Sequence, residues 1–296
     1  MYNISVIGCG KWAQTIINEI KLNNDFKIHS LVCRSKNLTN YKNIKIFKNI
    51  NDILKLKEVD CIFVAASPSA NLEIIELNKK YKKPLILEKP FSNSYKNSKK
   101  IKKISIENNI LIMPNLTNCF SECFIFLENF IKNNFNSINK IIIYDGNFGP
   151  FRNNIHPIWD WGYHPISMLI QFFGQKYFSK IRVTELRKYF RKKSGLVSKL
   201  KFKINNSINV NVVTGNLFNK KIRKLKIYFD NKILSYDMIN HKVYINDKII
   251  YKNNKSTLQS LLNNYKNKII LEKNFNYSQK LIETSCQTTN VLEQIY

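Results

Sequence analysis

The sequence predicts an α/β protein with an N-terminal doubly wound parallel sheet and a C-terminal α+β domain that carries a large, mostly antiparallel open sheet. Over the first 118 residues, short apolar runs alternate with segments of helical period, the pattern of strands buried on both faces between helices. From residue 180 to 252, extended segments follow one another across Asn- and Asp-containing turns, as in an antiparallel meander. The chain of 296 residues has room for both parts. We therefore expect domains at 1–118 and 119–296, with the last helix able to pack back on the first domain.

The chain opens with a strand, a glycine turn and a helix. An apolar run over 4–7 is followed at once by Gly-x-Gly-x-x-Ala at 8–13, and residues 14–22 then place isoleucines at helical spacing. The first glycine permits a tight turn, the second lets the backbone approach a pyrophosphate, and the small third residue lets helix and strand pack closely. An ordinary strand-to-helix turn is the alternative, but these flanks favour a dinucleotide-binding Rossmann sheet whose helix N-terminus faces the phosphates. The expected cofactor contacts here are Gly8, Gly10, Lys11, Trp12 and Ala13.

The end of the second expected strand, 27–33, bears on the choice of cofactor. An acidic residue at this place would bind the adenosine ribose 2′-OH of NAD. The sequence instead continues with Arg34, Ser35 and Lys36. A guanidinium, a hydroxyl and an ammonium suit a 2′-phosphate, so NADP is favoured over NAD.

Two further strands are expected to end at the same edge of the sheet. The run 60–66 leads into Ser-Pro, and the run 84–87 leads into Glu-Lys-Pro. Because the carboxyl ends of parallel strands border the cofactor, we expect contacts to it from Ser67, Pro68, Glu88 and Lys89. The Lys89–Pro90 bond is a candidate for a cis peptide, which X–Pro bonds tolerate. The other elements expected in this domain are strands at 44–47 and 110–113 and helices at 52–54, 71–81 and 94–108.

This order of motifs, Gly-x-Gly-x-x-Ala, then strand-Ser-Pro-helix, then strand-Glu-Lys-Pro, resembles the Gfo/Idh/MocA family of nicotinamide-dependent oxidoreductases. That family includes glucose–fructose oxidoreductase, inositol dehydrogenases and nucleotide-sugar dehydrogenases. The resemblance implies hydride transfer between NAD(P) and a secondary alcohol or ketone of a sugar, a cyclitol or a nucleotide sugar. Without the resemblance, Lys89 would be interpreted as a surface lysine that ends a strand. The chain departs from many relatives at 119–122, where it has Cys-Phe-Ser-Glu in place of their Arg-Phe-x-Pro.

Asp160 and His164 form the second candidate group. They are one turn apart at the expected start of a helix that stops at Gly174, so both side chains would lie on one helix face. Taken alone, Asp160 would be an N-cap and His164 a packed helical residue. The resembling family carries Asp-x-Gly-x-His here, and the resemblance implies that Asp160 and His164 act together with Lys89. Pro165 and Ser167 replace acidic residues that many relatives carry after the histidine.

The implied chemistry gives each of the three catalytic candidates one role. Oxidation of a secondary alcohol removes a proton from oxygen while a hydride leaves carbon for the nicotinamide. His164, with a reference pKa near ~6.5, would accept the proton. Lys89 would stabilise developing alkoxide charge, and Asp160 would orient the imidazole or the substrate hydroxyl. The candidate substrate-binding residues, each of which could equally be loop structure, are Asn115, Arg152, Asn153, Asn154, His156 and Trp159.

The net charge of +28 does not single out a nucleic acid or a membrane as partner. Lysine is spread through every segment beside abundant Asn and Ile, as in A/T-rich coding, with no separate basic block. Steering of an acidic substrate or NADP is a remaining role for this field. No run approaches the roughly 18 apolar residues of a membrane span, and the chain begins with a strand rather than a signal peptide. We expect a cytoplasmic homodimer or homotetramer that acts on a sugar-like small molecule.

Six cysteines are scattered along the chain, several within apolar strands and none in a paired CxxC motif. This distribution favours reduced core thiols over disulfides or zinc ligation. Cys119 and Cys123 lie one helical turn apart, but no histidine accompanies them, so we expect no metal site.

Three other functions stay open at this point. A non-catalytic NAD(P)-binding sensor would keep the same fold without needing Lys89, Asp160 and His164 together. A lyase- or hydrolase-like relative would hold NAD tightly and regain it unchanged after a transient oxidation. Nucleic-acid binding is suggested by the charge alone.

Overall fold

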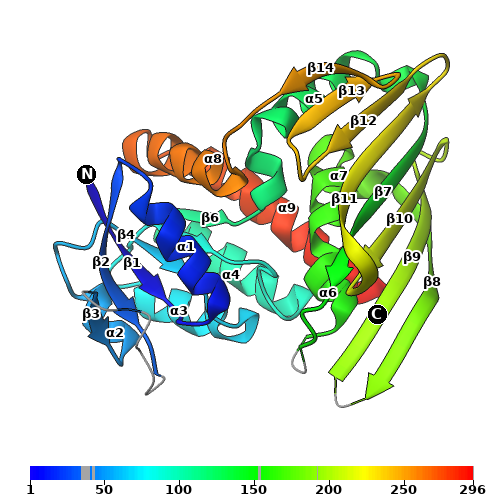
Figure 1. Ribbon diagram of the computed structural model, residues 1–296. Helices are drawn as coiled ribbons and strands as arrows, with labels where there is room; N and C mark the ends of the chain where they lie inside the picture. The colour runs from blue at the N-terminus through cyan, green and yellow to red at the C-terminus, as the bar shows by residue number, and fades with distance from the viewer. Residues whose placement is uncertain (35–40, 42–43, 153–154, 192, 296) are drawn as a thin grey trace. The chain divides into compact units, whose positions relative to one another are not determined.

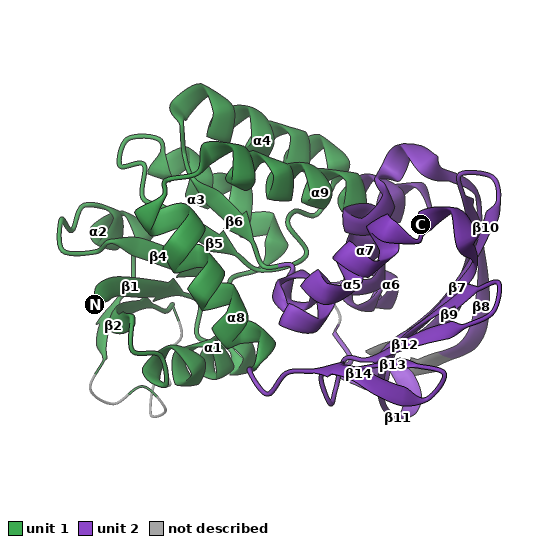
Figure 2. Ribbon diagram, turned by 90° about the horizontal axis from the view of Figure 1, so that it is seen from above, with its two compact units in different colours: residues 1–115, 256–289 green, residues 116–255, 290–296 purple. Residues whose placement is uncertain are grey.

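The computed structural model describes residues 1–34, 41, 44–152, 155–191 and 193–295 of the chain (Figure 1). The chain forms two compact units (Figure 2). Unit 1 comprises residues 1–115 and 256–289, and unit 2 comprises residues 116–255 and 290–296.

Residues 256–289 group with unit 1, whereas the sequence-based boundary placed them in the second domain and expected only the last helix to be able to pack back on the first. Hydrogen bonds join this segment to unit 1 at two places. Gln259 Nε2 donates to the backbone oxygen of Glu19 at 2.6 Å, and Ser278 Oγ donates to the backbone oxygen of Ile112 at 2.8 Å. Ile112 lies on the edge strand of the sheet, so its backbone groups need partners outside the ladder. Such pairs between segments far apart in the sequence leave no local pattern.

The sheet of unit 1 is parallel throughout and has the strand order β3-β2-β1-β4-β5-β6. The order reverses between β1 and β4, and doubly wound sheets bind ligands beside the carboxyl ends of strands at such a point. Ile4 and Val6 are fully buried, as expected for a strand covered on both faces. The strands are β1 (Tyr2–Ile7), β2 (Phe26–Val32), β3 (Lys45–Phe47), β4 (Cys61–Val64), β5 (Leu85–Leu87) and β6 (Ile112–Pro114).

The helices of unit 1 bury apolar stripes against this sheet. In α1 the buried residues are Ala13, Ile16, Ile17 and Ile20, which recur at three- and four-residue spacing. The residue that follows α4 is Asn109, whose φ of 52° is the left-handed conformation common after a helix. The helical elements are α1 (Lys11–Lys21), α2 (Ile50–Leu54), η2 (Pro68–Ala70), α3 (Asn71–Asn78), α4 (Tyr95–Asn108), α8 (Thr257–Asn264), the π-helical η6 (Tyr265–Leu271) and α9 (Phe275–Gln294), which runs on into unit 2.

The sheet of unit 2 has eight strands in the order β14-β13-β12-β11-β7-β10-β9-β8. It is mostly antiparallel, as predicted, but it is not a simple meander, because β7 lies between β11 and β10 and pairs with β10 in parallel. In β7, Ile141 and Ile143 are fully buried. The strands are β7 (Ile138–Phe148), β8 (Phe178–Arg191), β9 (Lys193–Ile204), β10 (Ile208–Gly215), β11 (Leu217–Phe229), β12 (Ile233–Asp237), β13 (Lys242–Ile245) and β14 (Lys248–Lys252).

Helices α5, α6 and α7 lie on one side of this sheet (Figures 1 and 2). The start of α5 is fixed by Ser121, whose side chain accepts from the backbone N–H of Phe124 at 3.0 Å and contacts the Tyr236 hydroxyl at 2.7 Å. The helical elements of unit 2 are η3 (Thr117–Phe120), α5 (Glu122–Asn133), η4 (Phe135–Ser137), α6 (Pro157–Trp161), α7 (Tyr163–Phe173) and η5 (Gln175–Tyr177).

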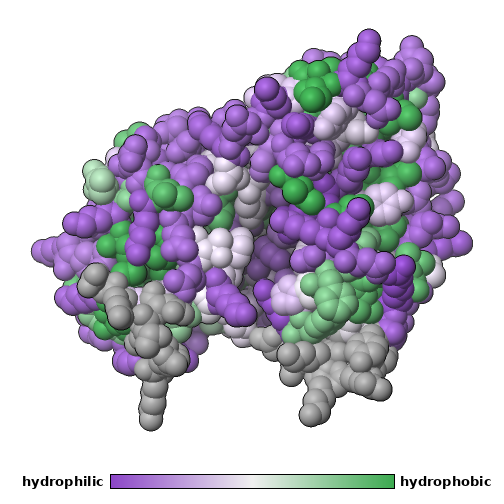
Figure 3. All heavy atoms as spheres, in the orientation of Figure 1, coloured by the Kyte–Doolittle hydropathy of each residue, from purple (hydrophilic) through white to green (hydrophobic). Residues whose placement is uncertain are grey.

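Hydrophilic side chains cover most of the visible surface of each unit, with scattered apolar groups between them (Figure 3). Exposed apolar side chains of the sheet in unit 2 include Phe148, Val183, Leu186, Ile249 and Ile250. Within the described part of the chain, no helix combines the length and the apolarity needed to cross a bilayer. The described residues also contain no group of three or more His, Cys, Asp or Glu side chains placed to hold a metal ion.

Candidate active site

The glycine turn after β1 is shaped by two different constraints. Gly8 has φ of +112°, its N–H donates to the backbone oxygen of Val32 at 3.0 Å, and a Cβ built on it would lie 2.5 Å from the backbone oxygen of Ala65. Only glycine fits this place. Gly10 is exposed, and a Cβ built on it would meet no atom within 4 Å. The turn therefore offers bare backbone beside open space, which suits the close approach of a pyrophosphate.

The N-terminus of α1 is suited to an anion. Its N-cap residue is Gly10, which has no side chain to accept from the first N–H groups, and its first turn holds no acidic residue. The exposed Lys11 adds a positive charge, while Ala13 is buried and lets the helix pack closely. An 11-residue helix carries a partial positive charge at this end. These residues fit the diphosphate of a dinucleotide.

The end of β2 carries the residues expected to choose between NAD and NADP. Arg34 is exposed and follows the buried Cys33. Ser35 and Lys36 lie outside the described residues, so the structure adds nothing to their expected role. Tyr41, which is buried, donates its hydroxyl to the backbone oxygen of Cys9 at 2.8 Å and so fixes the glycine turn from this side.

Cys9 and Cys33 form a disulfide, so the prediction of six reduced thiols was wrong for this pair. The two residues follow neighbouring parallel strands, β1 and β2, whose register brings their Cα atoms to 5.5 Å. The signal was present in the sequence: Cys9 is the second residue after one expected strand, Cys33 ends the next, and the two strands end at the same sheet edge. The other four cysteines, all buried, are not disulfide-bonded.

Glu88 joins the fingerprint helix to the strand that carries Lys89. Its buried carboxylate is hydrogen-bonded by the side chain of Trp12 from α1, by the Asn115 amide and, at 3.2 Å, by the backbone N–H of Lys89. Burial raises the pKa of Glu88, and these hydrogen bonds together with the nearby Lys89 charge oppose the rise. Asn115, expected to bind substrate, thus holds Glu88. The role of Trp12 in this network was not read from the sequence.

The strand ends named by the sequence do lie side by side. Ile7 of β1 pairs with Val64 of β4, and Val64 pairs with Leu87 of β5, so the residues that follow each strand share one edge. Lys89 is half-buried there, and its bond to Pro90 is cis, as the sequence suggested. At the end of β4, Ser67 is exposed with its hydroxyl 2.9 Å from that of Ser69, and Pro68 is half-buried.

In unit 2, Asp160 and His164 lie on two successive helices, where the sequence suggested a single helix start. Asp160 belongs to α6 and His164 to α7, with Gly162 at the junction. A Cβ on Gly162 would lie 2.5 Å from the backbone oxygen of Ile158, so a larger residue would disturb the last turn of α6. Asp160 and His164 are both buried, at 5% and 6% exposure. Arg152 is half-exposed, with Nη1 3.5 Å from Asp160 Oδ1.

The other predicted substrate residues have different surroundings. His156 is the N-cap of α6, and its Nδ1 accepts from the backbone N–H of Ile158 at 3.4 Å. Burial lowers the pKa of His156, which favours this neutral, accepting form. Trp159 is buried. Asn153 and Asn154 lie outside the described residues. Arg152 therefore presents the most accessible charge beside Asp160 among these described candidates.

The helix that carries Asp160 is anchored by residues that sequence reasoning missed. The guanidinium of Arg223, from β11, lies 3.2 Å from the fully buried carboxylate of Asp145 on β7 and 5.8 Å from the ring of Trp161 in α6. Arg223 thus ties α6 to the centre of the sheet by an ion pair and a cation–π contact. The three residues are far apart in the sequence, and no local pattern connects them.

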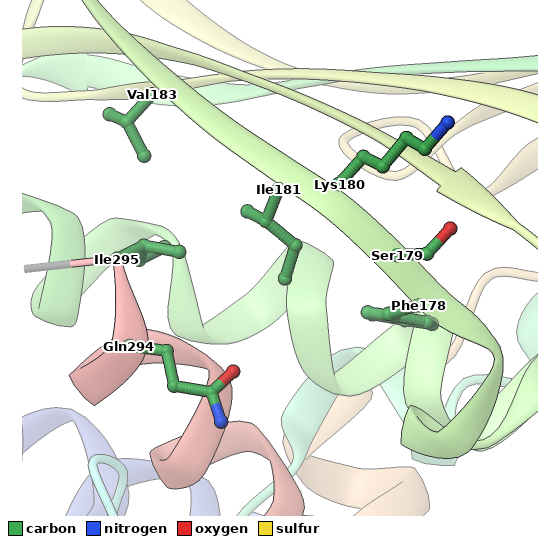
Figure 4. Close-up of a pocket in the computed structure, with 7 residues that line it drawn as sticks. All are labelled: Phe178, Ser179, Lys180, Ile181, Val183, Gln294 and Ile295. Atoms are coloured by element: carbon green, nitrogen blue, oxygen red, sulfur yellow. The ribbon is translucent and has the colours of Figure 1, made fainter.

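One cavity of unit 2 contains none of these residues. It is an open pocket of about 480 Å³ between β8 and the end of α9 (Figure 4). Its lining residues are Phe178, Ser179, Lys180, Ile181, Val183, Gln294 and Ile295. Lys89 belongs to unit 1, and Asp160 and His164 belong to unit 2, so their meeting in one site stays a prediction.

The fold matches solved oxidoreductase structures along the whole chain. A UDP-N-acetylglucosamine 3-dehydrogenase from Acidithiobacillus ferrooxidans has a TM-score of 0.79 at 14% identity, covering 98% of this chain and 97% of its own. A 3-ketoreductase from Actinomadura kijaniata in complex with NADP has a TM-score of 0.82 at 12% identity, covering 99% and 96%. Biliverdin reductase from Synechocystis sp. PCC 6803, with biliverdin and NADP+, has a TM-score of 0.77 at 13% identity, covering 99% and 98%.

Among curated protein sequences, none matches this chain. A family description does match its first part: residues 2–116 fit the Gfo/Idh/MocA oxidoreductase family, NAD-binding Rossmann fold. The match spans the parallel sheet, the glycine turn, Glu88 and Lys89. The likeness to this family is therefore shown for residues 2–116, the part that carries the glycine turn and the Glu-Lys-Pro motif.

Proposed function

We propose that this protein is an NADP-dependent oxidoreductase that transfers a hydride between nicotinamide and a secondary alcohol or ketone of a sugar, cyclitol or nucleotide sugar. One observation carries the proposal. The hydrogen bonds of Trp12 and Lys89 to Glu88 connect the start of the fingerprint helix with the residue that bears the amine. The turn proposed to bind phosphate and the lysine proposed for catalysis therefore follow strands that end at one edge of the parallel sheet.

The preference for NADP is supported by the chemistry at the end of β2. Arg34 is exposed at the place where an NAD-specific site carries an acid. A guanidinium can form two parallel hydrogen bonds to a phosphate, which an NAD ribose does not offer. Gly8, Gly10, Lys11, Trp12 and Ala13 would hold the diphosphate, and Ser67, Pro68, Glu88 and Lys89 would border the rest of the cofactor.

Bound NADP would supply the hydride acceptor, and the side chains would manage the proton and the charge on oxygen. We assign to His164 the acceptance of the hydroxyl proton, because an imidazole changes protonation near neutral pH. Lys89 donates a hydrogen bond to the substrate oxygen and stabilises its developing negative charge. Asp160 orients the imidazole or the substrate hydroxyl, and Arg152, 3.5 Å away, balances the Asp160 charge.

The substrate class follows from the resemblance and from Arg152. The similar structures include a nucleotide-sugar dehydrogenase and a 3-ketoreductase, which makes sugar-like alcohols and ketones the first compounds to test. The exposed side of the Arg152 guanidinium beside Asp160 suits a substrate that carries a carboxylate or a phosphate. Loss of substrate saturation in Arg152→Gln, with NADPH binding kept, would support this assignment.

The test is a fluorescence titration of the reduced protein with NADPH and NADH, followed by a screen of sugars and nucleotide sugars for absorbance change at the nicotinamide band. We expect tighter binding of NADPH than of NADH and turnover of at least one compound. The variant Arg34→Ser should reduce the difference in affinity between NADPH and NADH. Binding of NADPH with no hydride transfer across the panel would favour a sensor, and binding of neither cofactor would refute the proposal.

We also propose that the protein is a homodimer or homotetramer that needs neither a nucleic acid nor a membrane as partner. Support comes from the exposed apolar side chains of the sheet in unit 2, among them Val183 and Leu186 on the edge strand β8. Sedimentation analysis at several protein concentrations tests this. A monomer at all concentrations, or co-sedimentation with DNA or lipid vesicles at physiological salt, would contradict it.

A further inference from the structure

The disulfide joins two segments that are expected to bind the cofactor. Cys9 stands between Gly8 and Gly10 of the glycine turn, and Cys33 directly precedes Arg34. Their Cα atoms are 5.5 Å apart. The bond therefore ties the turn expected to hold the pyrophosphate to the strand end expected to hold the 2′-phosphate. A dinucleotide that contacts both the turn and the strand end would lie close to this disulfide.

The backbone on the Cys33 side of the bond is held firmly. The N–H of Cys33 donates to the backbone oxygen of Phe47 at 3.0 Å, and its side chain is 1% exposed. The Cys9 side is different, because Cys9 is only half-buried and lies in a turn rather than at a strand end. Hydrogen bonds from the Tyr41 hydroxyl to Cys9 and Gly10, and from the Gly8 N–H to Val32, hold this turn. We therefore expect the Cys9 turn, rather than the strand end, to move when the disulfide forms or breaks.

The remaining cysteines have the properties of inert core thiols. Burial raises the pKa of Cys61 and of Cys119, and raises that of Cys123 to about 11 and that of Cys286 to about 12. Because the thiolate is the reactive form, these four residues resist oxidation. The one disulfide among the described residues is thus the one beside the expected cofactor, and it closes a loop that contains the whole of α1.

We propose that Cys9 and Cys33 form a reversible oxidation site, and that the bonded form has a lower affinity for NADP(H) than the dithiol form. This inference rests on the proposed function. Two bonded sulfur atoms hold the glycine turn against the strand end. Two thiols need more room and let the Cys9 side chain turn aside, so the turn can adapt to a diphosphate. By linkage, a bound dinucleotide favours the dithiol by the same factor.

The reaction balances with oxidised glutathione as oxidant. One protein thiolate attacks the glutathione disulfide, the S–S bond breaks, and one glutathione leaves as a thiol. The second protein thiolate then attacks the mixed disulfide, releases the second glutathione and forms the Cys9–Cys33 bond. The protein dithiol loses two electrons and two protons, and the glutathione disulfide gains both.

The experiment equilibrates the full chain in glutathione buffers from reduced to oxidised, with and without saturating NADP+. Differential alkylation and peptide mass spectrometry give the bonded fraction of Cys9 and Cys33. With NADP+ bound, we expect the disulfide to be half formed only in a glutathione buffer at least ~5-fold more oxidising than without it. This factor is the lower end of ordinary coupling between sites. NADPH should bind the oxidised protein at least ~5-fold more weakly than the reduced protein.

The controls separate this inference from the proposed function. Cys33→Ser and, should that variant misfold, Cys9→Ser should lose the redox response of NADPH binding, whereas Cys286→Ser should keep it. A missing Cys9–Cys33 peptide under oxidised glutathione would overturn the site. Equal NADPH affinities in the two forms, or tighter binding by the oxidised one, would overturn the coupling and leave the proposed function intact. Failure of NADPH to bind either form would refute both.

Discussion

The glycine-turn edge of unit 1 and the helix junction of unit 2 are built in opposite ways. At the edge of unit 1, backbone geometry forms the candidate site. It consists of a turn with positive φ at Gly8, a helix N-terminus without an acidic residue, and strand ends aligned by the parallel register. At the junction, buried side chains form the candidate site. They are Asp160 and His164 on either side of Gly162, and Arg223 anchors α6. Substitutions that change the backbone conformation should therefore impair the first region. Substitutions that remove functional groups should impair the second.

The largest effect is expected at the helix junction. His164→Ala should lower turnover about 100- to 10,000-fold, because a general base contributes that much, and it should leave NADPH binding intact. The matched control is His241→Asn, since His241 has φ of 50° in a turn of unit 2 and Asn tolerates that conformation. Steady-state turnover and NADPH titration distinguish the two variants. Unchanged turnover in His164→Ala would remove this residue from the mechanism.

The anchor of α6 gives the next effect. Arg223→Met leaves the fully buried carboxylate of Asp145 without its guanidinium and removes the cation–π contact with Trp161. We expect a loss of about 3–5 kcal/mol in unfolding free energy, as for a broken buried ion pair. Denaturant unfolding measures it. The Arg223→Met, Asp145→Leu double variant should recover part of the loss, and a loss below ~1 kcal/mol in the single variant would show that the pair is not an anchor.

The two glycines of the turn test the role of backbone in unit 1. Gly8→Ala should lower both stability, by about 1–3 kcal/mol, and NADPH affinity, because its Cβ would lie 2.5 Å from the Ala65 oxygen at a φ of +112°. Gly10→Ala should lower NADPH affinity alone, because its Cβ meets only open space in the folded chain. Thermal unfolding and NADPH titration of both variants check this. Equal stability losses would contradict the distinction.

The smallest effect is the pH dependence of Glu88. Its pKa is raised by burial, so the folded state binds a proton more tightly than the unfolded state. Stability therefore falls as pH rises from the unfolded value near ~4.3 through the folded value, by roughly 1.4 kcal/mol for each unit of elevation. Glu88→Gln should lose this slope and gain relative stability toward neutral pH. Parallel stability–pH curves for the variant and the parent would contradict the raised pKa.

The sequence predicted the parts of the molecule that have local signatures. The parallel sheet, the turn at Gly8 and Gly10 and the cis bond before Pro90 follow from residues adjacent in the chain. The grouping of 256–289 with unit 1, the central place of β7 and the Arg223 anchor depend on contacts between distant segments. The Cys9–Cys33 bond lies between these cases, because parallel register predicts the proximity that cysteine counting alone does not.

A double-mutant cycle on Lys89 and His164 tests the central claim most directly. Turnover of a compound found in the sugar screen is measured for Lys89→Met, for His164→Ala and for the double variant, all in the reduced protein. Residues that act on one reacting oxygen are strongly non-additive, so we predict that the double variant is little slower than the slower single variant. Losses that multiply in the double variant would show that Lys89 and His164 act independently and would contradict a shared active site.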